Sequence, residues 1–196
     1  MQKLFNITNE TDHIVKIELV NGKKHNPLSL ELIKELTNSL IQISSQKKVK
    51  VLIISSEGPG FSAGHDLDEL RKNQNNKKFF NELFNECSNL MQTIMNLPQP
   101  VIAEVCGIAA AAGCQLVASC DLAVASEQSS FMTPGVNIGL FCSTPMVAVS
   151  RNLSRKKIME MLLTGEKLSA KDAVDYGLIN HCVPLDQLHQ KTLSIA

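Results

Sequence analysis

Residues 106–121, CGIAAAAGCQLVASCD, decide the fold, because they join a buried strand to a helix through a run of small side chains. The preceding apolar run, Val101–Val105, is typical of a buried strand. Gly107 ends that strand, and the small residues after it predict a helix that lasts until about Ser119. Small residues at a helix start let another molecule approach first-turn N–H groups that lack intrahelical partners. Together with the helix dipole, those donors favour a negative or strongly polarised oxygen. Tight helix packing is the alternative explanation for this stretch.

Residues 61–67, FSAGHDL, repeat this arrangement. A β-branched apolar run at 49–55 predicts a buried strand, which leads into a glycine loop at 58–60. Small residues at 62–64 let a ligand lie against the main chain, and a helix is expected to start near Asp66 or Leu67. Two such corners would aim two backbone N–H groups at one oxygen, which is the geometry of an oxyanion hole.

Predicted strands and helices alternate along the rest of the chain. Strands are expected at 13–19, 122–125, 130–133 and 179–183. Helices are expected after a Ser29 cap, at 79–97, at 155–163, and from a Ser169 cap to Gly177. Segment 72–78 is predicted to be an exposed loop or helix edge, and 134–145 to be irregular. This alternation favours an α/β domain with mostly parallel strands.

Composition excludes several classes of protein. A chain of 196 residues, 44% of them hydrophobic, suits one domain with a substantial core. Its 19 basic and 19 acidic side chains leave no net charge, and it has no Trp and one Tyr, so nucleic-acid binding is not indicated. No apolar run is long enough to span a membrane. Residues 1–6 lack a secretory apolar core, and Glu10 and Asp12 are atypical of a transit peptide. We therefore expect a cytoplasmic protein, or a mitochondrial matrix protein if the source is eukaryotic and its transit peptide is absent from this chain.

The cysteines do not form a recognisable metal or redox motif. They stand at positions 87, 106, 114, 120, 142 and 182, mostly among apolar or small residues, with no C-x-x-C pair. We expect buried free thiols and no metal site.

The two corners, in this order and spacing, resemble those of the crotonase superfamily, also called the enoyl-CoA hydratase/isomerase family. The resemblance runs from His13 to about Leu188. Its motifs are residues 61–67, 100–114, 120–123, 133–134, 139–140 and 163–166. The GHDL and AAAGCQ segments are similar to those of one branch of the family.

The resemblance implies a spiral fold of repeated ββα units. It also implies that residues 1–196 form a single domain of this family, with a truncated C-terminal helical region. A homo-oligomer of the trimer type is expected if the truncation permits it.

The site implied by the resemblance takes an acyl-CoA thioester. Its carbonyl would accept hydrogen bonds from the backbone N–H groups of His65 and Ala112, with the adenine end of the coenzyme along 61–63. Coenzyme A enters only as part of the substrate, and no tightly bound cofactor is expected. The expected coenzyme-binding residues are Phe61, Ser62, Ala63, Gly64, Asp66, Leu67 and Lys24. Lys23 and Lys24 would meet phosphates, although surface lysines are often simply solvated.

The two family positions that carry hydratase glutamates hold other residues here. They correspond to Gln115 and Gly135, and no carboxylate follows near Cys142 or Ser143, where an isomerase acid would stand. Glutamine exchanges no proton near neutral pH and glycine has no side chain. Each missing group typically contributes about 10²–10⁴-fold to the rate, so ordinary hydratase activity is doubtful.

Three functions in fatty-acid and lipid metabolism stay open. The first is an enoyl-CoA hydratase/isomerase-like enzyme that stabilises a thioester enolate. The second is an acyl-CoA thioesterase, and the third is a non-catalytic acyl-CoA binder or regulator. Neighbouring side chains receive structural assignments: His65 acts through its backbone, Cys114 packs, and Asp121 caps or pairs. Ser143 and Thr144 lie close by without a role, and Glu104 and Glu127 are left unassigned.

Overall fold

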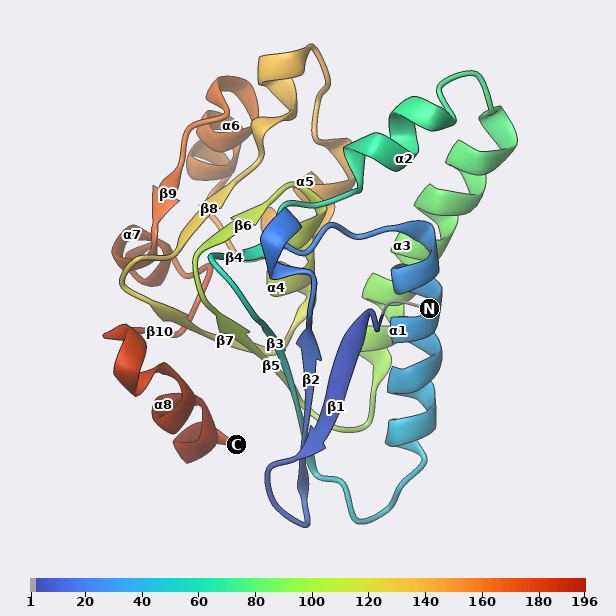
Figure 1. The fold of residues 1–196 in the computed structure, drawn as a ribbon. Coiled ribbons are helices and arrows are strands. Elements are labelled where there is room, and N and C mark those ends of the chain that lie inside the picture. Colours follow the sequence, from blue (N-terminus) through green and yellow to red (C-terminus); the bar gives the residue numbers. More distant parts are fainter. Residues whose placement is uncertain (1–2) are drawn as a thin grey trace.

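The computed structural model describes residues 3–196, so residues 1 and 2 of the N-terminal segment lie outside the description. Two sheets form the centre of the molecule, with helices around them (Figure 1). The six-stranded sheet has the spatial order β1 (Phe5–Asn9), β2 (Ile14–Leu19), β3 (Val51–Ser56), β5 (Val101–Val105), β7 (Leu122–Ser126) and β10 (His181–Val183). The four-stranded sheet has the order β4 (Gly60–Ser62), β6 (Ile108–Ala110), β8 (Ser130–Met132) and β9 (Leu168–Ser169). Only the edge pairs β1–β2 and β8–β9 are antiparallel within the described residues.

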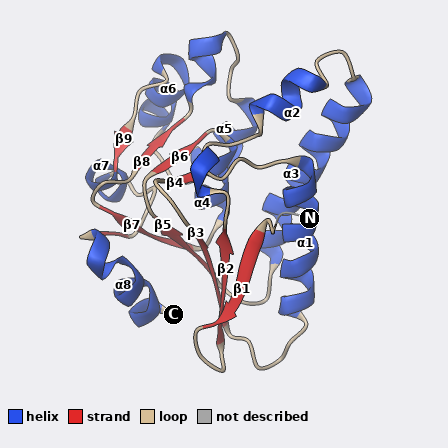
Figure 2. Cartoon of the chain, viewed as in Figure 1, coloured by secondary structure: helices blue, strands red, loops and turns tan. Residues whose placement is uncertain are grey.

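Successive strands alternate between the two sheets. The chain passes from β3 to β4, from β5 to β6 and from β7 to β8, each time leaving the larger sheet for the smaller one. A helical segment follows each pair (Figure 2). These are the repeated ββα units of the predicted spiral, and the α/β class with mostly parallel strands is confirmed.

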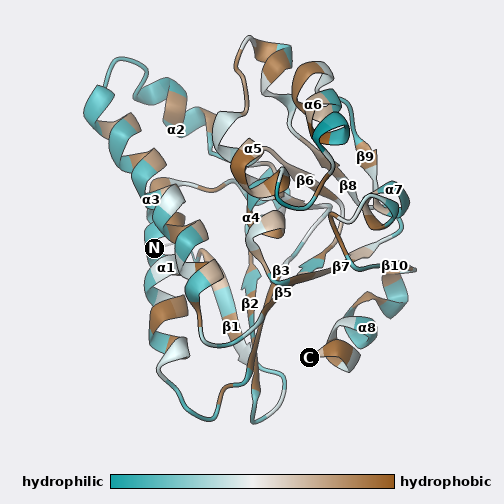
Figure 3. Cartoon of the chain, turned by 180° about the vertical axis from the view of Figure 1, so that it is seen from behind, coloured by the Kyte–Doolittle hydropathy of each residue, from teal (hydrophilic) through white to brown (hydrophobic). Residues whose placement is uncertain are grey.

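The helices cover both faces of the larger sheet. They are α1 (Leu30–Ser44), α2 (Leu67–Lys72), α3 (Lys77–Asn96), α4 (Ala112–Ser119), α5 (Ser143–Val149), α6 (Arg155–Thr164), α7 (Ala170–Asp175) and α8 (Leu188–Ile195). Leu52 and Ile54 of β3 belong to the main core, whereas Ile53 packs with Leu188 under α8. A strand buried on both faces explains why β3 is continuously apolar, and the hydrophobic colour follows the central strands in Figure 3.

Two predicted helix caps are confirmed. The Ser29 hydroxyl accepts from the Leu32 amide at 3.2 Å, and the Ser169 hydroxyl accepts from the Asp172 amide at 3.1 Å. All six cysteines are free thiols, either buried or half-buried. Along residues 3–196, no helix combines the length and the apolar character that crossing a bilayer requires.

The prediction of a helix directly after Gly107 is wrong. Residues 108–110 form β6, and α4 begins only at Ala112. β6 is paired with β4 on one side and β8 on the other, and this pairing overrides the helical preference of alanine. The region 134–145 is also more regular than expected, because a 3₁₀ turn spans Pro134–Ile138 and α5 starts at Ser143. β1 and α8 were not predicted either.

Candidate active site at two glycine corners

The fold brings the two corners together. β4 and β6 are parallel neighbours, with Gly60 opposite Ile108 and Ser62 opposite Ala109. Because parallel strands end at the same edge of a sheet, the chain leaves both strands at one place. The segments after Ser62 and after Ala110 are therefore adjacent, although about fifty residues separate them in the sequence.

Gly64 lies directly against the second corner. A Cβ atom added at Gly64 would stand 3.1 Å from the Ala112 nitrogen and 3.0 Å from the Ala110 carbonyl oxygen. Gly64 also has a φ of +87°, a conformation that other residues adopt only with strain. Both the close approach and the backbone angle require glycine here, and His65 follows immediately.

The amides of His65 and Ala112 have no acceptor among the described residues. Ala112 is the first residue of α4, so its N–H has no intrahelical partner. The preceding residue, Ala111, has the unusual angles φ 49° and ψ −118°, and its own N–H donates to the Met132 carbonyl at 2.9 Å. Neither the His65 nor the Ala112 amide donates to another group in the part of the chain that the structure describes. Two free donors thus flank the contact between the corners.

A buried asparagine fixes the first corner. The Asn26 side chain donates to the carbonyls of Glu57 at 2.9 Å and Gly60 at 2.8 Å. The Ser62 hydroxyl donates to the Asn26 carbonyl at 2.9 Å and accepts from the Gly64 amide at 3.2 Å. The sequence analysis did not identify this role of Asn26. Since each partner is internal, the position of the Gly64 backbone is set by buried hydrogen bonds.

The expected coenzyme-binding residues divide into two groups. Phe61 and Ser62 are fully buried and Gly64 is buried, so these three belong to the core beneath the corner. Lys24, Ala63, Asp66 and Leu67 line a cleft of about 370 Å³, which Pro27, His65, Asp68 and Arg71 complete. Lys23 is exposed and does not line it. Asp66 also caps α2 by accepting from the Asp68 amide at 2.9 Å, so its carboxylate has a structural partner.

The His65 ring is structural rather than exposed. It packs edge-on against the Phe84 ring, with 5.6 Å between centroids, and neither ring nitrogen is exposed. Burial lowers the pKa of His65, which keeps the imidazole neutral at neutral pH. The expectation that His65 acts through its backbone fits this placement.

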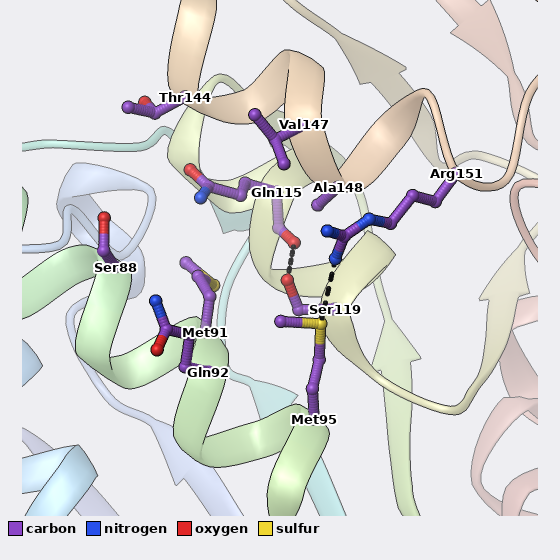
Figure 4. A pocket seen from close by; sticks show the side chains of 10 residues that line it. All are labelled: Ser88, Met91, Gln92, Met95, Gln115, Ser119, Thr144, Val147, Ala148 and Arg151. Carbon is purple, nitrogen blue, oxygen red and sulfur yellow. Dashed lines mark hydrogen bonds between the residues drawn. The ribbon is translucent and has the colours of Figure 1, made fainter.

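A second cavity, of about 180 Å³, is lined by residues of α3, α4 and α5, including Gln115 (Figure 4). Gln115 lies three residues after Ala112 and therefore on the same face of α4. Its side chain lines the cavity, the residue is 6% exposed, and Oε1 has no hydrogen-bond partner among the described residues. The cavity is lined by Ser88, Met91, Gln92, Met95, Gln115, Ser119, Thr144, Val147, Ala148 and Arg151.

Gly135 lines neither the cleft beside His65 nor the cavity at Gln115. Its amide donates to the Cys142 sulfur at 3.3 Å, and the Leu140 amide donates back to its carbonyl at 2.9 Å. A Cβ atom at Gly135 would lie 2.4 Å from the Leu140 carbonyl oxygen and 2.7 Å from the Cys142 sulfur. The loop therefore closes over this position and leaves no room for a side chain.

The remaining candidates have structural surroundings. Burial raises the pKa of the Cys114 thiol to about 12, and burial also raises the pKa of Cys142. Burial thus disfavours the nucleophilic thiolate form of both residues. The Asp121 carboxylate accepts from the Val101 amide at 2.8 Å, as predicted. Glu104 pairs with His189 of α8 at 3.0 Å, Glu127 is exposed, and Ser143 is exposed at the start of α5.

Strands that alternate between two sheets, with glycine corners meeting at one edge, define a crotonase-type fold. Residues 9–196 match the family model described as enoyl-CoA hydratase/isomerase, and the chain belongs to this family.

Two of the similar proteins found carry the same name, and a third is a bacterial enoyl-CoA hydratase. A curated human protein, enoyl-CoA hydratase domain-containing protein 3, mitochondrial, is 52% identical over 187 residues, which cover 95% of this chain and 61% of that protein. The crystal structure of the human domain-containing protein 3 superposes with a TM-score of 0.94 at 50% identity, covering 98% of this chain and 76% of that one. An enoyl-CoA hydratase structure from Mycobacterium smegmatis has a TM-score of 0.96 at 40% identity, covering 99% and 75%. The chain thus spans about three fifths of the length of this curated relative.

Proposed function

We propose that this chain binds an acyl-CoA thioester and polarises its carbonyl between the amides of His65 and Ala112. The observation that carries the proposal is the contact between the corners, where Gly64 approaches the Ala112 nitrogen and both amides lack partners among residues 3–196. Two N–H donors beside one oxygen stabilise the charge that develops on a thioester when it becomes an enolate. The positive end of α4 adds to this field.

The coenzyme portion is assigned to the cleft beside His65. Ala63, Asp66 and Leu67 line it next to the first corner, and Lys24 and Arg71 supply positive charge for phosphates. Lys24 already lies 3.9 Å from the Asp68 carboxylate, so phosphate binding exchanges one exposed ion pair for another. Within the expected segment 61–63, only the Ala63 side chain is exposed and can contact the adenine.

Ordinary hydration is not part of the proposal. By the family resemblance, Gln115 corresponds to one hydratase glutamate and exchanges no proton near neutral pH, while Gly135 corresponds to the other and is enclosed by Leu140 and Cys142. A thioesterase needs a nucleophile or a base, and the thiols of Cys114 and Cys142 are held protonated by burial. We therefore infer acyl-CoA binding with enolate stabilisation, and hydratase turnover reduced by several orders of magnitude relative to an enzyme with both acids.

The test compares a thioester with its carbonyl-free analogue. Calorimetry would measure binding of butyryl-CoA, of S-butyl-CoA, which is a thioether without the carbonyl, and of free coenzyme A. We expect the thioester to bind about threefold to tenfold more tightly than the thioether, the contribution of the hydrogen bonds to the carbonyl. Exchange of the α-protons of butyryl-CoA in deuterated water then reports enolate formation. Equal affinity for thioester and thioether, or no binding of either, contradicts the proposal.

We also propose that copies of the chain assemble into a trimer. Exposed apolar side chains gather on the loop before α5, where Ile138 is 71% and Leu140 59% exposed, and a trimeric assembly of copies would cover them. Light scattering on the purified chain measures its mass, and a monomer contradicts this part.

The curated human relative is named as mitochondrial, and we propose the same compartment here, to be tested by fractionation of cells that express the full protein.

A further inference from the structure

We propose that the cavity between α3, α4 and α5 selects an acyl group with a terminal carboxylate, which Arg151 binds. This inference rests on the proposed acyl-CoA binding and names the class of acyl group that the same site takes.

The cavity leads away from the paired amides. Gln115, one turn after Ala112, lies at the same end as Ser88 and Thr144 in Figure 4, whereas Met95, Ser119 and Arg151 lie at the other end. Along α3, Ser88 and Met95 are seven positions apart, which corresponds to about 10 Å of helix. An acyl chain whose thioester carbonyl meets Ala112 thus extends past Gln115 toward Arg151.

The cavity lining is mainly apolar but also carries several polar groups. Ligand pockets are lined mainly by apolar side chains, with a few polar groups that fix the ligand's orientation, and usually exceed about 300 Å³. This one is about 180 Å³, and the hydroxyl of Thr144 and the amides of Gln92 and Gln115 contribute to its wall. Gln115 Oε1 lies buried without a donor in the described part of the chain. The small volume and the polar groups in the wall suit a short acyl chain that carries a polar group of its own.

Arg151 places a positive charge at one end of the cavity. Its guanidinium has no carboxylate within ion-pair distance among residues 3–196, and its one side-chain contact of hydrogen-bond type is to the Met95 sulfur at 3.7 Å. A thioether is a weak acceptor, whereas the planar guanidinium group pairs with a carboxylate through two parallel hydrogen bonds. The cavity wall therefore ends in a cation whose strongest available interaction is with an anion on the ligand.

The test uses acyl-CoA pairs of equal carbon number. Calorimetry would measure glutaryl-CoA against pentanoyl-CoA, and adipoyl-CoA against hexanoyl-CoA, on the wild-type chain and on Arg151→Gln. We expect the chain to bind the carboxylate-bearing member of at least one pair about fivefold to tenfold more tightly, a range reduced for the exposure of Arg151. Arg151→Gln should remove this preference without weakening the alkyl esters. Arg155→Gln is the matched control, because Arg155 is exposed on α6 and does not line the cavity.

The outcomes separate the two proposals. If both members of each pair bind equally, or the alkyl ester binds better, the terminal-carboxylate inference is overturned while acyl-CoA binding stands. If the preference survives in Arg151→Gln, Arg151 is not the recognising group and the inference is overturned as well. If no acyl-CoA binds, the proposed function itself fails.

Discussion

Replacing Gly64 with alanine tests the central contact of the site. Gly64 has a φ of +87°, and the added methyl group would stand 3.0 Å from the Ala110 oxygen and 3.1 Å from the Ala112 nitrogen. The backbone angle alone costs about 1–2 kcal/mol for a residue other than glycine. The methyl group must also push the second corner by a few tenths of an ångström, which moves the two amides apart.

Gly139→Ala is the matched control. Gly139 has a φ of +76°, and no atom lies within 4 Å of the Cβ position. Both variants should therefore lose similar stability from the backbone angle, about 3–8 °C in Tm for a chain of this size. Only Gly64→Ala disturbs the amide pair. We expect its affinity for butyryl-CoA to fall about twofold to tenfold, the value of one hydrogen bond, and α-proton exchange to fall about 10²-fold or more.

Three measurements distinguish the effects of Gly64→Ala from those of Gly139→Ala. Thermal denaturation gives the loss of stability, calorimetry gives the affinity, and proton exchange observed by NMR gives the stabilisation of the enolate. If Gly64→Ala loses no more affinity and no more exchange rate than Gly139→Ala, the two amides do not act together and the reasoning from the corners is refuted.

Further predictions concern the loop over Gly135 and two titrating groups. Gly135→Glu should lower Tm by several degrees and fail to restore hydration, because its Cβ meets the Leu140 carbonyl at 2.4 Å; a stable variant with hydratase activity on crotonyl-CoA would show that the loop opens. Burial lowers the pKa of His65 below its ordinary 6.5, so its neutral form stabilises the fold above pH 6.5 and that contribution declines as pH falls toward the folded-state pKa. His65→Phe should therefore flatten the loss of stability below pH 6.5 in urea titrations, and an unchanged slope would contradict the assignment. Hydrogen bonding to Lys16, opposed by desolvation, lowers the pKa of Glu10 below 4.5. The Glu10 carboxylate therefore contributes stability above pH 4.5 that is lost as pH falls through the lowered pKa. Glu10→Gln should reduce this loss of stability in acid, and an unchanged loss would show that the Glu10–Lys16 pair contributes nothing.

Much of the fold was predictable from local pattern. The apolar run Val101–Val105 and the β-branched run at 49–55 form β5 and β3, and both are buried on two faces as such runs require. Ser29 and Ser169 cap helices because a side-chain oxygen three residues before a free amide is a local relation. β6 was missed because Ile108 is followed by a run of alanines, which favours a helix, and the strands that pair with it, β4 and β8, are distant in sequence.

The sequence by itself determined the strand runs, the helix caps and the two glycine corners, since each depends on residues close together in the chain. Only the tertiary structure decided that Gly64 contacts Ala112, that Phe61 and Ser62 lie in the core, and that Gln115 opens into a cavity ending at Arg151. These relations arise from strand pairing and helix packing between distant segments. Their geometry depends on how the whole core packs, which no single stretch of sequence encodes.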